Sequence, residues 1–135
     1  MNAWRTRIRC YVSPVGKPKI AEWRDGLSVQ ERADADAFIG MMRMVTDWRP
    51  PYYRPQLRPV KGAKASQVRG LGELRWSSAK TQHRLLGFFG DGVWYAVLGC
   101  THKQNIYSPA DALATAVKRK NEIQKREVKT VEYDL

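Results

Sequence analysis

Two arginines in neighbouring segments, Arg75 and Arg84, are the side chains whose types and spacing point most directly to chemistry. The segments GELRWSS and TQHRLLGFFG read as β-strands, and a polar turn at Ala79–Lys80 separates them. If the strands pair symmetrically about that turn, Arg75 lies directly opposite Arg84. Cross-strand partners have Cβ atoms ~5 Å apart, where like charges are unfavourable. Either the register differs from this one, or something negatively charged belongs beside the pair.

The residues leave two explanations of this pair open. Glu73 lies two residues before Arg75 on the same strand face and could neutralise it in a structural salt bridge. Alternatively, the two guanidinium groups bind a phosphate, because their paired N–H donors fit its oxygens. Cleavage of RNA by its own 2′-hydroxyl needs in-line geometry, a cation beside the phosphorane, and a general acid and base. Arg, Lys, His and Tyr can supply these groups without a metal ion.

The motifs of other common active sites are missing from the sequence. Neither His83 nor His102 stands at a ligand spacing from a cysteine or a carboxylate, so no metal site is expected. No glycine-rich phosphate loop and no nucleophile-elbow pattern occurs. The sequence therefore predicts neither a metal nor an organic cofactor.

The charge balance points to a polyanionic partner. The 135 residues include 24 Lys and Arg against 13 Asp and Glu, which gives a net charge of +11. Solubility alone asks for a net charge of only ~2–8 in a small domain. We expect nucleic acid or another polyanion as the partner.

The length and the apolar pattern indicate one domain, 1–135, in the cytoplasm. Cys10 and Cys100 are far apart in the sequence, and both are interpreted as buried free thiols. No run approaches the ~20 apolar residues of a membrane span, and the N-terminal residues lack the apolar core of a signal peptide.

Periodicity and capping signals predict the order β-α-α-loop-β-β-β-α, an α+β fold with an antiparallel sheet. Residues 4–12 alternate as a half-buried strand, and 18–26 form a short helix. Ser28 and Glu31 form a capping box that opens a helix to about Val45. Asp91-Gly92 predicts a tight hairpin between strands at 82–90 and 93–101. The last helix is expected at 108–127, with Ser108 as its N-cap.

A long, basic, proline-rich loop at 48–70 is the first candidate for contact with RNA. Its aromatic rings could stack on bases while its cations follow the phosphates. The alternative is that its two tyrosines simply cover the long helix. The basic side chains of the last helix form a second candidate surface. The predicted RNA-binding residues are Arg49, Tyr52, Tyr53, Arg54 and Arg58 in the loop, and Lys118, Arg119 and Lys120 in the helix.

Several segments in the second half of the chain, taken in order, resemble the RelE/ParE toxin superfamily, particularly its HigB-like and phage-derived branch. The approach to the second strand, the "ELR" start of that strand, the strand after it and the Ser-Pro start of the last helix are similar to the family's pattern. The segments that carry the resemblance are Arg58–Gly62, Gly72–Arg75, His83–Leu86, Lys103, and Ser108-Pro109 with Ala116 and Arg119.

The resemblance implies the toxin of a type II toxin–antitoxin pair. Such a toxin has a mainly antiparallel, four-stranded sheet with helices packed on one face. It binds the ribosome and cuts messenger RNA without a metal, and it forms a hetero-oligomer with its antitoxin, a small helix-turn-helix or acidic protein. Arg75 and Arg84 then match the phosphate-binding arginines and Lys103 the lysine at the strand end, while Lys61 and His102 are further candidates for acid, base or charge roles.

Some positions depart from the family's pattern. With Ser108-Pro109 aligned, the family's aromatic residue falls on Thr101, its second lysine on Gln104, and the histidine of some members on Gly99. Two other functions therefore stay open. One is a non-catalytic toxin or phage inhibitor of a host protein such as gyrase, and the other is a basic RNA-binding module without toxicity.

Overall fold

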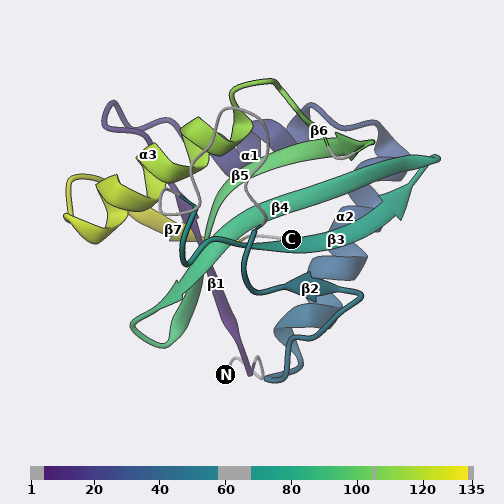
Figure 1. Cartoon of the computed structure of the whole chain (residues 1–135), viewed down its shortest axis with the longest axis horizontal. Helices are drawn as coiled ribbons and strands as arrows, with labels where there is room; N and C mark the ends of the chain where they lie inside the picture. Colours follow the sequence, from purple (N-terminus) through teal and green to yellow (C-terminus); the bar gives the residue numbers. More distant parts are fainter. Residues whose placement is uncertain (1–4, 58–67, 105, 134–135) are drawn as a thin grey trace.

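The computed structural model describes residues 5–57, 68–104 and 106–133 (Figure 1). In chain order the described elements are β1 (Arg7–Tyr11), α1 (Lys19–Asp25), α2 (Val29–Arg43), β2 (Tyr53–Arg54), β3 (Gly72–Ser78), β4 (Thr81–Gly90), β5 (Val93–Lys103), β6 (Ile106–Ser108), α3 (Ala112–Gln124) and β7 (Thr130–Glu132).

The described strands form one mixed sheet, so the predicted four-stranded, mainly antiparallel sheet is wrong. The sheet has seven strands in the order β2-β3-β4-β5-β1-β7, with β6 paired to β5 off this path. β1 runs parallel to β5, whereas all other neighbours are antiparallel. After β1, the helices α1 and α2 carry the chain to the opposite edge of the sheet, where β2 lies. The strands β3, β4 and β5 then follow in order back toward β1, and this long connection allows β5 to lie parallel to β1.

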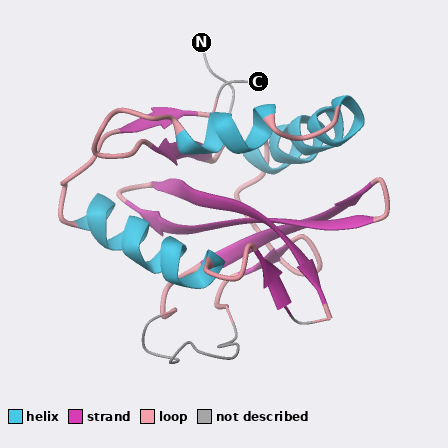
Figure 2. Cartoon of the chain, turned by 90° about the horizontal axis from the view of Figure 1, so that it is seen from above, coloured by secondary structure: helices cyan, strands magenta, loops and turns pink. Residues whose placement is uncertain are grey.

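Helices cover both faces of the sheet, which corrects the prediction that they pack on one face (Figure 2). α1 and α2 close one core, around Ile8, Leu85 and Trp94. α3 closes a second core, around Leu86 and Val97. The central strands β4 and β5 are apolar on both sides, and a sheet of this kind must be covered twice.

The predicted β3–β4 register is confirmed residue by residue. Leu74 pairs with Leu85, Arg75 with Arg84, and Trp76 with His83. Both turn residues have positive φ, 51° at Ala79 and 64° at Lys80, as a two-residue hairpin turn of this kind requires. The second predicted hairpin turn is confirmed as well, with φ of 53° at Asp91 and 78° at Gly92.

Of the two predicted helix caps, one is confirmed and one is wrong. The capping box is present, because Glu31 N donates to Ser28 Oγ at 3.1 Å and Ser28 N donates to Glu31 Oε1 at 3.4 Å. The last helix begins later than predicted, with Asp111 as its N-cap, because Ser108 is the last residue of β6.

Two further predictions concern burial and hydropathy. Cys10 and Cys100 are buried free thiols as predicted, and burial raises the pKa of each to about 12. Within the described ranges, no helix has the length and apolar character needed to cross a membrane.

Candidate phosphate-binding site

A cluster of polar side chains lies on the α3 side of the sheet and crosses five strands. Strand pairing builds it, because cross-strand partners share a face. Arg54 pairs with Glu73, Arg75 with Arg84, and His102 with Tyr107. Arg84 also pairs with Cys100, two residues before His102, which places the imidazole on the same face. The members of this cluster, called the arginine cluster below, are Arg54, Glu73, Arg75, Arg84, His102 and Tyr107.

Glu73 is the centre of the arginine cluster and is only 3% exposed. Its Oε1 lies 3.5 Å from Nε of Arg75, 3.9 Å from Nε of Arg84 and 4.0 Å from Nε of Arg54. Its Oε2 accepts a hydrogen bond of 2.5 Å from the Tyr107 hydroxyl. The predicted salt bridge of Glu73 with Arg75 is therefore present. With three guanidinium groups around one carboxylate, the cluster still carries excess positive charge.

The three arginines differ in their access to solvent. The Arg84 side chain is 4% exposed, whereas those of Arg75 and Arg54 are 30% and 31% exposed. Nη1 of Arg84 donates to the His83 carbonyl at 2.8 Å, and its buried Nε has no hydrogen-bond partner. Burial lowers the pKa of Arg84, and the Glu73 carboxylate opposes that shift. Arg84 thus forms the floor of the cluster, and Arg75 and Arg54 form its accessible rim.

His102 has the properties of a proton acceptor. Partial burial lowers the pKa of His102, and the charge of Arg84 lowers it further, so both effects favour the neutral imidazole. Its ring meets the Tyr107 ring edge-on, with centroids 4.9 Å apart. Burial raises the pKa of Tyr107, as does its hydrogen bond to Glu73.

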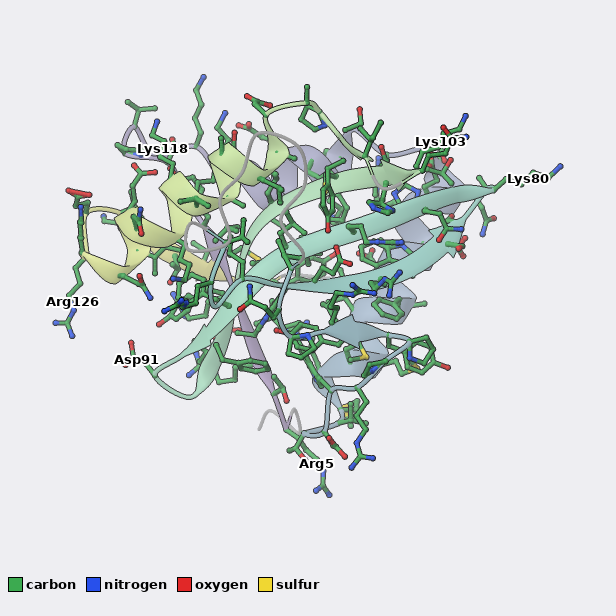
Figure 3. All side chains as sticks on the ribbon, in the orientation of Figure 1. Arg5, Lys80, Asp91, Lys103, Lys118 and Arg126 are labelled. Atoms are coloured by element: carbon green, nitrogen blue, oxygen red, sulfur yellow. The ribbon has the colours of Figure 1, made fainter. Side chains whose placement is uncertain are left out.

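Three predicted basic residues are not placed in the arginine cluster. Lys103 directly follows His102, so its side chain points to the opposite face of β5. It is exposed at the end of that strand (Figure 3). Arg58 and Lys61 lie outside the described residues.

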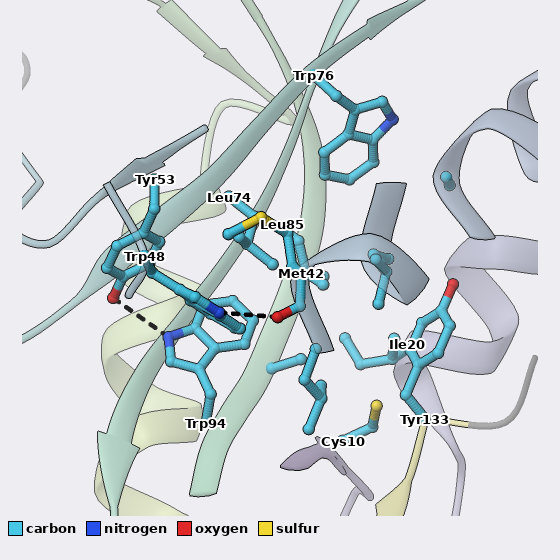
Figure 4. Close-up of a cluster of buried hydrophobic side chains, with 14 residues drawn as sticks. Cys10, Ile20, Met42, Trp48, Tyr53, Leu74, Trp76, Leu85, Trp94 and Tyr133 are labelled. Atoms are coloured by element: carbon cyan, nitrogen blue, oxygen red, sulfur yellow. Dashed lines mark hydrogen bonds between the residues drawn. The ribbon is translucent and has the colours of Figure 1, made fainter. Parts of the chain in front are cut away.

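The predicted RNA-binding residues of the 48–70 loop have separate environments. Arg49 is exposed and pairs with Asp47 at 2.6 Å, and Tyr52 is half exposed beside Phe38. Tyr53 is 3% exposed, and its hydroxyl accepts a hydrogen bond of 3.2 Å from Trp94 Nε1 (Figure 4). The alternative interpretation, that a tyrosine of this loop covers the long helix, fits Tyr52, because Phe38 belongs to α2. The ring of Tyr53 instead packs against Trp48, Phe89 and Trp94. Arg54 belongs to the arginine cluster.

The predicted RNA-binding residues of α3 also lie in different environments. Lys118 is exposed to solvent. Nη1 of Arg119 donates to the Val97 carbonyl at 2.9 Å, and the guanidinium lies 4.8 Å from the Tyr11 ring centroid. Nζ of Lys120 lies 5.7 Å from the Phe88 ring centroid. Arg119 ties α3 to the sheet, while Lys118 remains available to a ligand.

Sequence reasoning missed Tyr107 altogether, and it predicted Arg54 as an RNA-binding residue of a loop, not as a member of this cluster. Tyr107 lies on β6, a three-residue strand whose pattern is too short to recognise. Arg54 lies on the two-residue β2, inside the segment predicted as a loop. A symmetric hairpin about Asp91-Gly92 would pair Arg84 with Gly99 and would place His102 on the opposite face. The register shifts between Leu86 and Gly87, so that Arg84 pairs with Cys100, and this bulge, which the period of a strand does not predict, brings His102 to the arginine face.

The glycine at position 99 is required by a neighbouring side chain on the sheet face opposite the arginine cluster. A Cβ at this position would overlap the indole ring of Trp23, on α1. A histidine at position 99 would thus have no room, and it would point away from the arginine cluster.

Comparison of the chain with protein-family models, with curated proteins and with solved structures finds no match. The described residues also contain no group of three or more His, Cys, Asp or Glu that could hold a metal ion. Function is therefore inferred from the arginine cluster, the charge of the chain and its sequence pattern.

Proposed function

We propose that the protein is the toxin of a type II toxin–antitoxin pair, which binds messenger RNA at the ribosome in the cytoplasm and cleaves it at the arginine cluster. The observation that carries this proposal is the convergence of three arginines on one sheet face that also holds His102. The net charge of +11 supports a polyanionic substrate. The ordered resemblance to the RelE/ParE superfamily selects RNA and an antitoxin partner among the possible polyanions and partners.

The residues of the cluster have distinct roles in this proposal. Arg75 and Arg84 stabilise the negative charge of the phosphorane, where preorganised donors are most effective. His102 takes the proton of the 2′-hydroxyl, which attacks phosphorus and displaces the 5′-oxygen. The products are a 2′,3′-cyclic phosphate and a 5′-hydroxyl. Lys61 is the sequence-based candidate for the acid that protonates the leaving oxygen.

A toxin or RNA-binding module without catalysis is the second candidate. It is favoured by the burial of Arg84 and by the position of Lys103 on the opposite face of β5. Such a protein would bind RNA or a host protein through the exposed rim of the cluster and leave transcripts intact.

Expression of the protein with and without its neighbouring reading frame separates these candidates. The proposal predicts growth arrest by the protein alone, with new transcript 5′ ends inside codons, and relief by Arg75→Ala with Arg84→Ala. Arrest with intact transcripts would support the non-catalytic candidate, and cleavage that persists in the double variant would show that the site is wrong.

A further inference from the structure

Glu73 places a negative charge at the centre of a site proposed to bind a negative ligand. The carboxylate is 3% exposed, and each of its oxygens has a separate task. Oε1 is shared by the three arginines, at 3.5 to 4.0 Å, and Oε2 is held by Tyr107 at 2.5 Å. Because both oxygens are engaged, the carboxylate keeps its place among the arginines.

A phosphate that contacts Arg75 and Arg84 must come close to Glu73. The Nε atoms of both arginines lie within 3.9 Å of Oε1, so a ligand on the same guanidinium groups lies only a few ångströms further away. Repulsion between like charges is strong at such distances when water is excluded. Glu73 therefore opposes the binding of the anion that its arginines attract.

The same contacts align the arginines. Each of the three guanidinium groups has its Nε within 4.0 Å of Oε1 of Glu73, so the three cations are held around one oxygen. The geometry thus combines alignment of three cations with partial neutralisation of their charge.

We propose that Glu73, anchored by Tyr107, is an internal counter-anion that offsets one of the three arginine charges and limits the affinity of the site for an RNA phosphate. The inference rests on the proposed function for its ligand. It makes Glu73 a determinant of affinity, in addition to its part in the packing of the sheet.

The test measures dissociation constants of a labelled 12-nucleotide single-stranded RNA and of inorganic pyrophosphate for the full chain. Glu73→Gln keeps the shape of the side chain and removes its charge. We expect it to bind both probes about 10-fold more tightly, equivalent to about 1.4 kcal/mol. A purely structural role would give the opposite sign, because a disturbed cluster binds an anion less well. Glu127→Gln, at an exposed position, makes the same charge change elsewhere and should leave both constants within about twofold.

A charge-balanced variant keeps the test valid if Glu73→Gln alone is unstable. Arg54→Gln should weaken binding about 10-fold, and Arg54→Gln with Glu73→Gln should return to within about threefold of the wild type. Equal or weaker binding by Glu73→Gln, or no gain of the double variant over Arg54→Gln, would overturn the inference. If pyrophosphate follows the predicted order and RNA is not bound, the RNA proposal fails and the counter-anion role stands. Binding of neither probe by any of these proteins would refute both.

Discussion

Arg75 of β3 and Arg84 of β4 are direct cross-strand partners, and both direct Nε at the same oxygen of Glu73. This shared oxygen explains how the sheet tolerates two like charges side by side. The third arginine, Arg54, gives the group its excess positive charge. The pair is therefore both a structural ion-pair network and a candidate phosphate site, and substitutions can separate the two roles.

Replacement of Arg84 by methionine should separate stability from binding. Glu73 would keep Arg75, Arg54 and Tyr107 as partners, and methionine fills much of the same buried volume. We expect the free energy of unfolding to change by no more than about 1 kcal/mol, because a buried guanidinium is costly to desolvate and Glu73 keeps two other arginines to compensate its charge. RNA affinity should fall at least about 10-fold. A loss of about 3–5 kcal/mol in urea unfolding would instead assign Arg84 to stability.

The depressed pKa of His102 predicts a pH dependence of stability. The unfolded chain takes up a proton as the pH falls through about 6.5, whereas the folded chain resists protonation of His102 to lower pH. His102 therefore contributes stability above this pH that is lost as the pH falls through its folded-state pKa. Unfolding should be compared at pH 7.5 and 5.5, and the wild type should lose more stability than His102→Gln. An identical loss in both proteins would refute the assigned shift.

The pH profile of RNA cleavage should depend on the same imidazole. If His102 is the general base, the rate rises through a pKa below 6.5 and is flat at neutral pH. His102→Gln should lower the rate about 100-fold and remove this acid limb. Retention of the limb in the variant would assign the base to another residue.

Local sequence patterns predicted some parts of this fold, whereas pairings between distant segments could not be predicted from them. The β3–β4 register followed from strand alternation and a two-residue turn, so the Arg75–Arg84 pair was predictable. The capping box of Ser28 and Glu31 was predictable for the same reason, because its two residues are only three positions apart. The parallel β1–β5 pairing and the position of α3 on the opposite face depend on contacts distant in the sequence, which no local pattern contains. Tyr107 was missed for a different reason, because β6, although it pairs with the neighbouring β5, is too short to be recognised from its pattern.

Lys118 and Arg119 are neighbours with opposite predicted effects. Arg119→Ala removes the hydrogen bond to Val97 and the packing on Tyr11, so we expect a loss of about 1–3 kcal/mol in stability. Lys118→Ala should leave stability within about 0.5 kcal/mol and weaken RNA binding, with a shallower salt dependence. Stability by thermal unfolding and affinity by fluorescence anisotropy would check both. The reverse pattern would exclude Lys118 from the RNA surface.

Gly99→Ala should be costly, because its Cβ would overlap the Trp23 ring. We expect a loss of about 1–3 kcal/mol in the free energy of unfolding. Gly90→Ala is a matched control in β4, where the nearest atom to the new Cβ is Tyr95 Cε2 at 3.4 Å, an ordinary contact. Equal stability of the two variants would contradict the packing of Trp23 against β5.

The most direct test of the central claim is the affinity for a 12-nucleotide single-stranded RNA as a function of salt concentration. The wild type should be compared with Arg75→Gln plus Arg84→Gln. For a single strand, every phosphate that a protein neutralises adds about 0.7 to the steepness of log K against log salt. If Arg75 and Arg84 hold phosphate, the double variant should bind more weakly and have a slope smaller by about 0.7–1.4. An unchanged affinity and slope would contradict the claim that this pair binds RNA.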